Sequence, residues 1–203
     1  MFLSDVGLIV TIKANKVVTE EIGARELDEL QTGMATQYDV PENELTMNVQ
    51  YVTQGTLDID AADLTDEQAL NDLQQAIATV LDVPEEAVTL TVENGVVTYE
   101  ISRDTYEDAT AAQARLAQTN VADLINAETE TVEVTNVSPD ADITAEVTIT
   151  VDVDESTLSE GDIEGLGVAV ADFLEGYNYT DVEYTGKFNV FQFCHYWLCL
   201  SFS

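Results

Sequence analysis

A strand–helix–strand pattern occurs four times along the chain, at about residues 6–49, 55–94, 95–137 and 143–186, and each occurrence is called a pass below. This repetition limits the folds that the chain can adopt. Two strands and one helix bury too little apolar surface to be stable alone. The passes must therefore pair, and the connections between them indicate how.

The second pass shows the pattern most clearly. Leu57 and Ile59 alternate with aspartates, which predicts a strand with one side in solvent. Thr65 and Gln68 then have the spacing of a capping box and predict the start of a helix. The apolar stripe of that helix is Leu70, Leu73, Ile77 and Val80, and the return strand contains Val88, Leu90 and Val92.

The other passes keep the same order of elements. In the fourth pass Val147, Ile149, Val151 and Val153 predict a strand, Ser159 a helix cap, and Val182 and Tyr184 the return strand. Thr19 and Thr105 are the expected caps of the first and third passes. The tripeptide at 39–41, Asp-Val-Pro, recurs at 82–84, after the helix in each case.

The connections predict an α+β fold in which βαβ passes pair as ferredoxin-like βαββαβ domains with antiparallel sheets. Asn94-Gly95 lies between two alternating runs and predicts a hairpin that joins passes two and three. Residues 51–138 are then one complete domain, and residues 136–140 form a linker. Residues 1–50 and 139–186 become halves of a preceding and a following module of a longer tandem array. As an alternative, passes one and four pair with each other in a permuted domain.

The charge of the chain restricts its partners. Forty Asp and Glu face six Lys and Arg, and the formal net charge is −34. Nucleic acid and anionic membrane surfaces would repel such a protein, whereas divalent cations or salt would stabilise it. This balance favours an extracellular or cell-surface setting, with a halophilic soluble protein as the alternative. No basic region or long apolar run of a secretory signal is visible at the N-terminus.

No catalytic or cofactor-binding residue can be assigned. His195 is the only histidine, and it lies in the atypical C-terminal segment. A catalytic site in which a histidine base activates a nucleophile therefore has no other possible base. Cys194 and His195 are adjacent but lack a matching ligand pair for zinc, and no Gly-rich phosphate loop is present. The sequence therefore predicts a protein that is not an enzyme, and it identifies no cofactor apart from weakly bound calcium.

Calcium is the metal that the acidic residues suit best. Asp58 and Asp60 with Asp63 stand where a strand meets a loop, and Asp152 and Asp154 with Glu155 stand at the equivalent place. Alternation puts each aspartate pair on one face of a strand, where two carboxylates can share a hard cation. Neither segment is an EF-hand loop, so we expect weak, diffuse binding and assign no metal ligand.

Residues 187–203 differ in composition from the rest of the chain. No acid occurs from Tyr184 onward, and this end holds both cysteines and the only tryptophan. It is too short to span a bilayer, and a docking strand for another subunit is one interpretation. We favour a read-through into an intron, because Gly186-Lys187-Phe188 can be encoded with the splice-donor sequence GTAAGT. A eukaryotic source and a fragment of a longer protein would follow.

The domain expected at residues 51–138 resembles the SEA-type ferredoxin-like modules of extracellular proteins, on the order of its elements and on the hairpin Asn94-Gly95-Val96-Val97-Thr98-Tyr99. In cleaving members of that family a Gly-Ser step at this hairpin breaks the chain. Here Val96 follows Gly95 and has no hydroxyl, so cleavage is not expected. Two glycosylation sequons, at Asn136 and Asn178, are expected in loops. The resemblance implies a structural, spacer or adhesive repeat segment whose partners are neighbouring modules or further copies; a ligand-binding or regulatory domain is the alternative.

Overall fold

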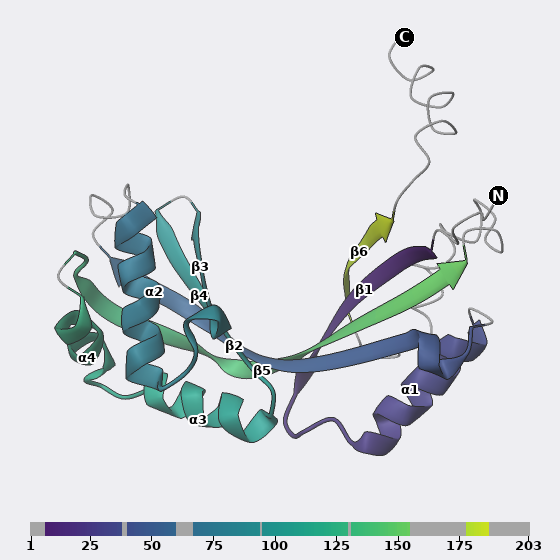
Figure 1. The fold of residues 1–203 in the computed structure, drawn as a ribbon. Coiled ribbons are helices and arrows are strands. Elements are labelled where there is room, and N and C mark those ends of the chain that lie inside the picture. Colours follow the sequence, from purple (N-terminus) through teal and green to yellow (C-terminus); the bar gives the residue numbers. More distant parts are fainter. Residues whose placement is uncertain are drawn as a thin grey trace, which may run out of the picture. The chain divides into compact units, whose positions relative to one another are not determined.

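The structure is a computed structural model that describes residues 7–37, 40–59, 67–93, 95–129, 131–154 and 178–186, with side chains between residues 11 and 150 apart from Ile12 and Gln37. The elements of this part of the chain are, in order, β1 (Gly7–Val18), α1 (Ala24–Gln37), η1 (Glu42–Glu44), β2 (Leu45–Ile59), α2 (Glu67–Leu81), η3 (Glu85–Ala87), β3 (Val88–Glu93), β4 (Val96–Arg103), α3 (Tyr106–Leu116), α4 (Val121–Glu128), β5 (Val134–Asp154) and β6 (Asn178–Gly186). The predicted α+β class is confirmed (Figure 1).

The strands form one sheet in the order β3-β4-β2-β5-β1-β6. β4 is antiparallel to both of its neighbours, β2 and β3. The chain divides into a central unit, residues 15–27 and 48–147, and a terminal unit, residues 1–14, 28–47 and 148–203. The terminal unit thus contains strands from both the first and the last pass. The six-stranded order as a whole is not that of a single four-stranded ferredoxin-like sheet.

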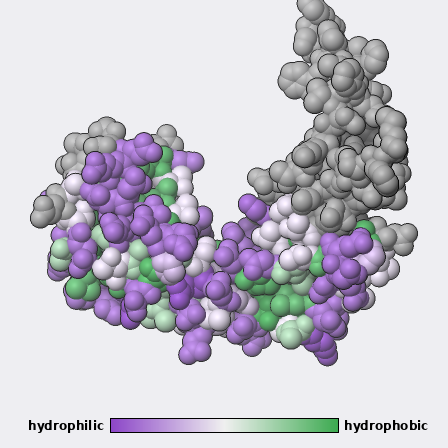
Figure 2. Space-filling view, viewed as in Figure 1, coloured by the Kyte–Doolittle hydropathy of each residue, from purple (hydrophilic) through white to green (hydrophobic). Residues whose placement is uncertain are grey.

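The core of the central unit lies between one face of the sheet and helices α2, α3 and α4. Its fully buried members include Leu73 and Ile77 from α2, Val97 and Ile101 from β4, and Ile125 from α4. Alternation in β4 directs these β-branched side chains towards the helices and leaves Glu100 exposed. On the face seen in Figure 2, hydrophilic residues cover most of this unit.

The stripe predicted on α2 is confirmed at its centre. Leu73 and Ile77 are buried, whereas Leu70 and Val80 at its ends are only half-buried. The rest of the buried face of α2 is made by Ala69, Ala76, Ala78 and Leu81 instead of Leu70 and Val80. The buried face is therefore rotated slightly about the helix axis relative to the predicted stripe. Small side chains at these positions allow α2 to approach the sheet and its neighbouring helices closely.

The hairpin between passes two and three is also confirmed. Glu93 pairs with Val96 across a two-residue loop, and β3 and β4 are antiparallel throughout their register. Gly95 has φ +82°, a conformation that side chains with a Cβ rarely adopt. This requirement explains the glycine at the second loop position.

The two helices that precede an Asp-Val-Pro tripeptide end in the same way. In each, a glutamine of the helix donates to the carbonyl of the glutamate after the proline, and the valine N–H donates back to the helix. The equivalent bonds are Gln31 Nε2 to Glu42 O (3.2 Å) and Gln74 Nε2 to Glu85 O (3.1 Å), and Val40 N to Ala35 O and Val83 N to Ala78 O (3.0 Å each). The internal repeat therefore extends from sequence to individual hydrogen bonds.

Several expectations about local structure are wrong. Thr19 is not a helix cap, because α1 begins at Ala24. The helical part of pass three is two helices, α3 and α4, separated by a polar turn at residues 117–120. Residues 136–140, expected to be a linker, lie within β5. The sequon asparagines are likewise in strands, since Asn136 belongs to β5 and Asn178 begins β6.

Thr105 caps α3 as predicted: its Oγ1 accepts from the Asp108 N–H at 3.1 Å. Replacing Thr105 with alanine removes this acceptor and should lower the free energy of unfolding by about 1 kcal/mol. The matched control is Thr110→Ala in the same helix, whose Oγ1 only donates to the Tyr106 carbonyl one turn back. Chemical denaturation of the two variants tests this, and an equal effect of both would exclude a capping role for Thr105.

Candidate functional site: a cleft beside strand β5

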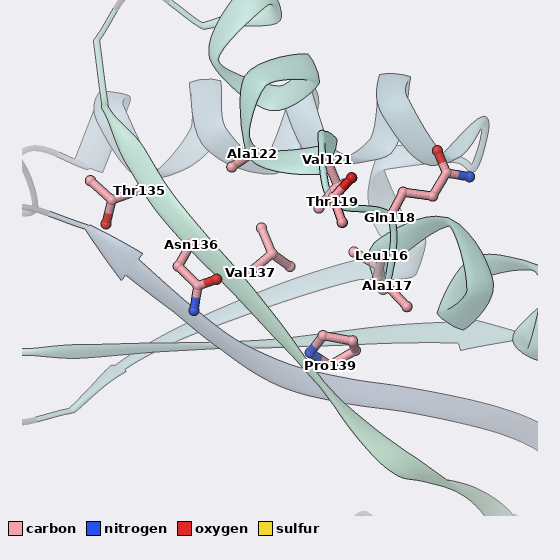
Figure 3. Close-up of a pocket in the computed structure, with 10 residues that line it drawn as sticks. All are labelled: Leu116, Ala117, Gln118, Thr119, Val121, Ala122, Thr135, Asn136, Val137 and Pro139. Carbon is pink, nitrogen blue, oxygen red and sulfur yellow. The ribbon is translucent and has the colours of Figure 1, made fainter.

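A cleft of about 280 Å³ lies between the α3–α4 connection and β5 in the central unit (Figure 3). Figure 3 shows Val137 on the side of β5 that faces the helices and Asn136 on the opposite side. The lining residues are Leu116, Ala117, Gln118, Thr119, Val121, Ala122, Thr135, Asn136, Val137 and Pro139. The polar turn that divides the third-pass helix therefore forms one wall of this cleft.

The chemistry of the cleft is neutral. Its lining combines small apolar side chains with two amides and two hydroxyls, and no acid, base or thiol is among them. These groups can donate and accept hydrogen bonds, but they supply neither a nucleophile with a base nor a ligand set for a metal. The cleft suits contact with an uncharged amphipathic group.

Asp58, one of the residues considered for calcium, contacts the outer side of this strand. Its Oδ2 accepts from Asn136 Nδ2 at 3.1 Å, and its backbone carbonyl accepts from Thr135 Oγ1 at 3.0 Å. Asn136 Nδ2 also lies 2.9 Å from Ser138 Oγ. The carboxylate of Asp58 thus ties the end of β2 to β5.

The structure does not describe the side chains of the other carboxylates that were considered for calcium. Asp60, Asp63 and Glu155 lie outside the described residues, and the side chains of Asp152 and Asp154 in β5 are not described. Over the described ranges, no three His, Cys, Asp or Glu side chains gather closely enough to hold a metal ion. Among the remaining predicted residues, Thr65, Ser159, Cys194 and His195 also lie outside the described ranges.

Among the described side chains, three buried polar atoms have no hydrogen-bond partner: Thr53 Oγ1, Tyr99 Oη and Arg103 Nε. They lie on adjacent strands, because Thr53 pairs with Ile101 and Gly55 pairs with Tyr99. The Tyr99 ring covers Gly55, where an added Cβ would meet both the ring and the Ser138 carbonyl. Burial raises the pKa of Tyr99, and the negative charge of Asp140 raises it further. The contact between Gly55 and Tyr99 was not predicted from the sequence, although a glycine within a strand indicates that another part of the chain approaches its backbone closely.

Tyr51 connects the segment before α1 to the sheet. Its buried hydroxyl accepts from the Ile22 N–H at 2.9 Å, and its ring lies edge-on to Tyr106 with centroids 6.0 Å apart. Burial raises the pKa of Tyr51, although the bond from Ile22 opposes the shift. These contacts fix structure and leave no reactive group exposed.

Comparisons with known proteins add no relative to this description: no family model and no curated protein matches the sequence. Within the described part of the chain, no helix is long and apolar enough to cross a membrane. The site must therefore be interpreted from its own residues.

Proposed function

We propose that the chain is a non-enzymatic structural, spacer or adhesive segment of an acidic repeat protein at the cell surface or outside the cell. The observation that carries this proposal is the repeated helix ending, in which Gln31 and Gln74 make equivalent bonds to the backbone after Pro41 and Pro84. Such duplication of whole supersecondary units is typical of repeat proteins, where the unit serves as a building element.

The finer fold that we propose for the central unit is ferredoxin-like, a split pair of βαβ passes. In that topology the first strand lies between the third and fourth, and the second lies at the edge. In passes two and three, β2 is the first strand, β3 the second, β4 the third and β5 the fourth. The order β3-β4-β2-β5 is then second, third, first, fourth, which matches this topology. The antiparallel pairing of β2 with β4 supports the same assignment.

For the terminal unit we propose the permuted alternative, in which pass four supplies the first half of a module and pass one the second half. If β5 is counted as the first strand, β6 as the second, β1 as the third and β2 as the fourth, the order β2-β5-β1-β6 supports this second ferredoxin-like module. Passes one and four then complete each other, and neighbouring modules are not needed to fill their sheet.

The proposed setting is one with abundant cations. Divalent ions and salt would neutralise the −34 charge, and neighbouring modules or further copies would be its partners. Thermal unfolding of the full chain should therefore be measured in low salt, in millimolar calcium, and in sodium chloride of equal ionic strength. We expect a higher midpoint in both salts and a further rise in calcium.

Comparing calcium with sodium chloride distinguishes specific calcium binding from general screening of the negative charge. A calcium-specific rise follows the linkage between ion binding and folding, and supports a calcium-rich extracellular setting. Equal rises in both salts would indicate screening alone and would favour the halophilic alternative. If neither salt raises the midpoint, cations do not stabilise the fold, and this part of the proposal is wrong.

A second candidate function, ligand binding by the central unit, is favoured by the cleft beside β5. Its neutral lining suits an uncharged amphipathic molecule such as a small saccharide. A screen of neutral mono- and disaccharides by amide chemical shifts tests this candidate. Binding would move the signals of residues 116–122 and 135–139 together, whereas no saturable shift at millimolar ligand would exclude this ligand class.

A further inference from the structure

Strand β3 forms one edge of the sheet. It is the first strand in the order β3-β4-β2-β5-β1-β6, and β4 is its only neighbour among the strands that the structure describes (Figure 1). The side of β3 that faces away from β4 therefore presents backbone groups without a partner strand. Such an edge is a template for adding another strand.

The hairpin register identifies the backbone groups at this edge. A two-residue loop is closed by a hydrogen-bonded pair, here Glu93 with Val96, and bonded and non-bonded pairs then alternate along an antiparallel ladder. Val88, Leu90 and Val92 belong to the non-bonded pairs. The N–H and C=O groups of Leu90 and Val92 point away from β4 and can bond to an added strand. At Val88 only the C=O is available, because its N–H donates to the Glu85 carbonyl.

Except at its last residue, Glu93, β3 carries no charge, proline or glycine that would block strand addition. The stretch Val88–Val92 has no charge, no proline and no glycine, although one residue in five of the whole chain is acidic. Its exposed residues include Thr89, Thr91 and, with 37% of its surface accessible, Val92. This edge is therefore an uncharged surface on a strongly acidic protein.

Acidic residues stand at both ends of this edge. Glu85 and Glu86 precede β3, Glu93 ends it, and all three are exposed. If two copies of β3 paired antiparallel about Leu90, Glu93 of each copy would face Ala87 of the other and approach Glu86. Like charges at both ends oppose that dimer, and the net charge of −34 on each copy opposes it further.

We propose that the edge of β3 binds an extended segment of another protein, with an uncharged, alternating centre and basic residues at both ends. Basic ends complement Glu85 and Glu86 at one end of the edge and Glu93 at the other. None of the described strands carries Lys or Arg at both ends, so we assign the segment to another protein. The surface consists of η3 and the edge of β3, and does not depend on how the passes pair.

The side chains next to the edge define the centre of the partner segment. On the open face of the sheet Thr91 pairs with Thr98, which in turn pairs with Thr56. On the helix-facing side Val92 pairs with Val97. A segment in which threonine and valine alternate would extend both rows, because cross-strand pairs of β-branched residues are favourable.

The probe for this surface is a labelled peptide with two lysines, then Thr-Val-Thr-Val-Thr, then two lysines. Fluorescence anisotropy with the full 203-residue chain at low salt measures its affinity. Val92→Pro removes an outward N–H and should weaken binding by about tenfold or more, because it also blocks the approach of the strand. The matched control Val92→Thr keeps the N–H and the β-branched shape, and should bind within about threefold of the wild type.

Two further peptides separate strand addition from simple charge attraction. The first has proline in place of both valines and keeps the four lysines, and the second has glutamates in place of the lysines. We expect weak binding of both, and intact folding of each protein variant by circular dichroism. Equal binding of the proline peptide, equal binding to Val92→Pro, or no binding of the lysine-flanked peptide would each overturn the proposal.

Discussion

Replacing Gly55 with alanine is expected to lower the free energy of unfolding by about 3 kcal/mol. Gly55 lies inside β2, where the Tyr99 ring and the Ser138 carbonyl occupy the space that a Cβ would need. The carbonyl belongs to the backbone of β5, so a change of side-chain rotamer cannot make room. Urea denaturation of the full chain measures the loss.

Gly23 provides the matched control, because no atom lies within 4 Å of the position that its Cβ would take. Gly23→Ala should change the free energy of unfolding by less than about 1 kcal/mol in either direction. A Gly55→Ala variant that is as stable as Gly23→Ala would contradict the close approach of β2, Tyr99 and β5.

The second large effect is a loss of stability at alkaline pH through Tyr99. Its hydroxyl is buried without a hydrogen-bond partner, and its pKa in the folded state is raised above the ordinary value of 10.0. Above pH 10 the unfolded chain releases this proton while the folded chain still holds it, so unfolding becomes more favourable as pH rises. The contribution is fully present below pH 10 and is lost progressively above it.

Tyr99→Phe tests this origin of the alkaline transition. The phenylalanine keeps the ring over Gly55 and removes the unpartnered hydroxyl, so stability at neutral pH should be equal or up to about 1 kcal/mol higher. The midpoint of alkaline unfolding should move to higher pH. Tyr106→Phe, which alters a half-buried tyrosine on α3, is the control. An unchanged alkaline midpoint in Tyr99→Phe would assign the transition to other groups.

Local features that depend on neighbouring residues could be predicted from the sequence. The Asn94-Gly95 hairpin, the cap at Thr105 and the buried Leu73 and Ile77 each follow from turn, capping or helical spacing rules. These rules describe interactions within a few residues, and tertiary packing agrees with them here. The repeat was visible for the same reason, since Pro41 and Pro84 mark equivalent helix ends.

Features that depend on distant parts of the chain were missed. Pro139 suggested a linker, but proline is accepted in a strand where its nitrogen needs no partner, and that depends on the surrounding sheet. The same error led to the prediction that Asn136 lies in a loop, whereas it lies in β5. The contact between Gly55 and Tyr99 joins residues from two passes, and its register was not considered.

The candidate site could be predicted only in part. Asp58 was correctly predicted to be a solvent-exposed residue near the end of a strand. Its hydrogen bonds to Thr135 and Asn136 could not be predicted, because they depend on the pairing of β2 with β5. The cleft itself arises from the turn between α3 and α4, which the sequence analysis treated as helix. Neutral lining residues such as Gln118 and Thr119 carry no motif that would have identified it.

The pairing of pass one with pass four is the central claim, and amide hydrogen exchange of the full chain tests it most directly. β1 lies between β5 and β6 in the strand order, so amides at 7–14 and 178–186 should exchange at least about a hundredfold more slowly than in an unfolded chain. Deleting residues 1–14 should remove the protection of β6. Fast exchange of β1 in the full chain, or protection of β6 that survives this deletion, would contradict the pairing.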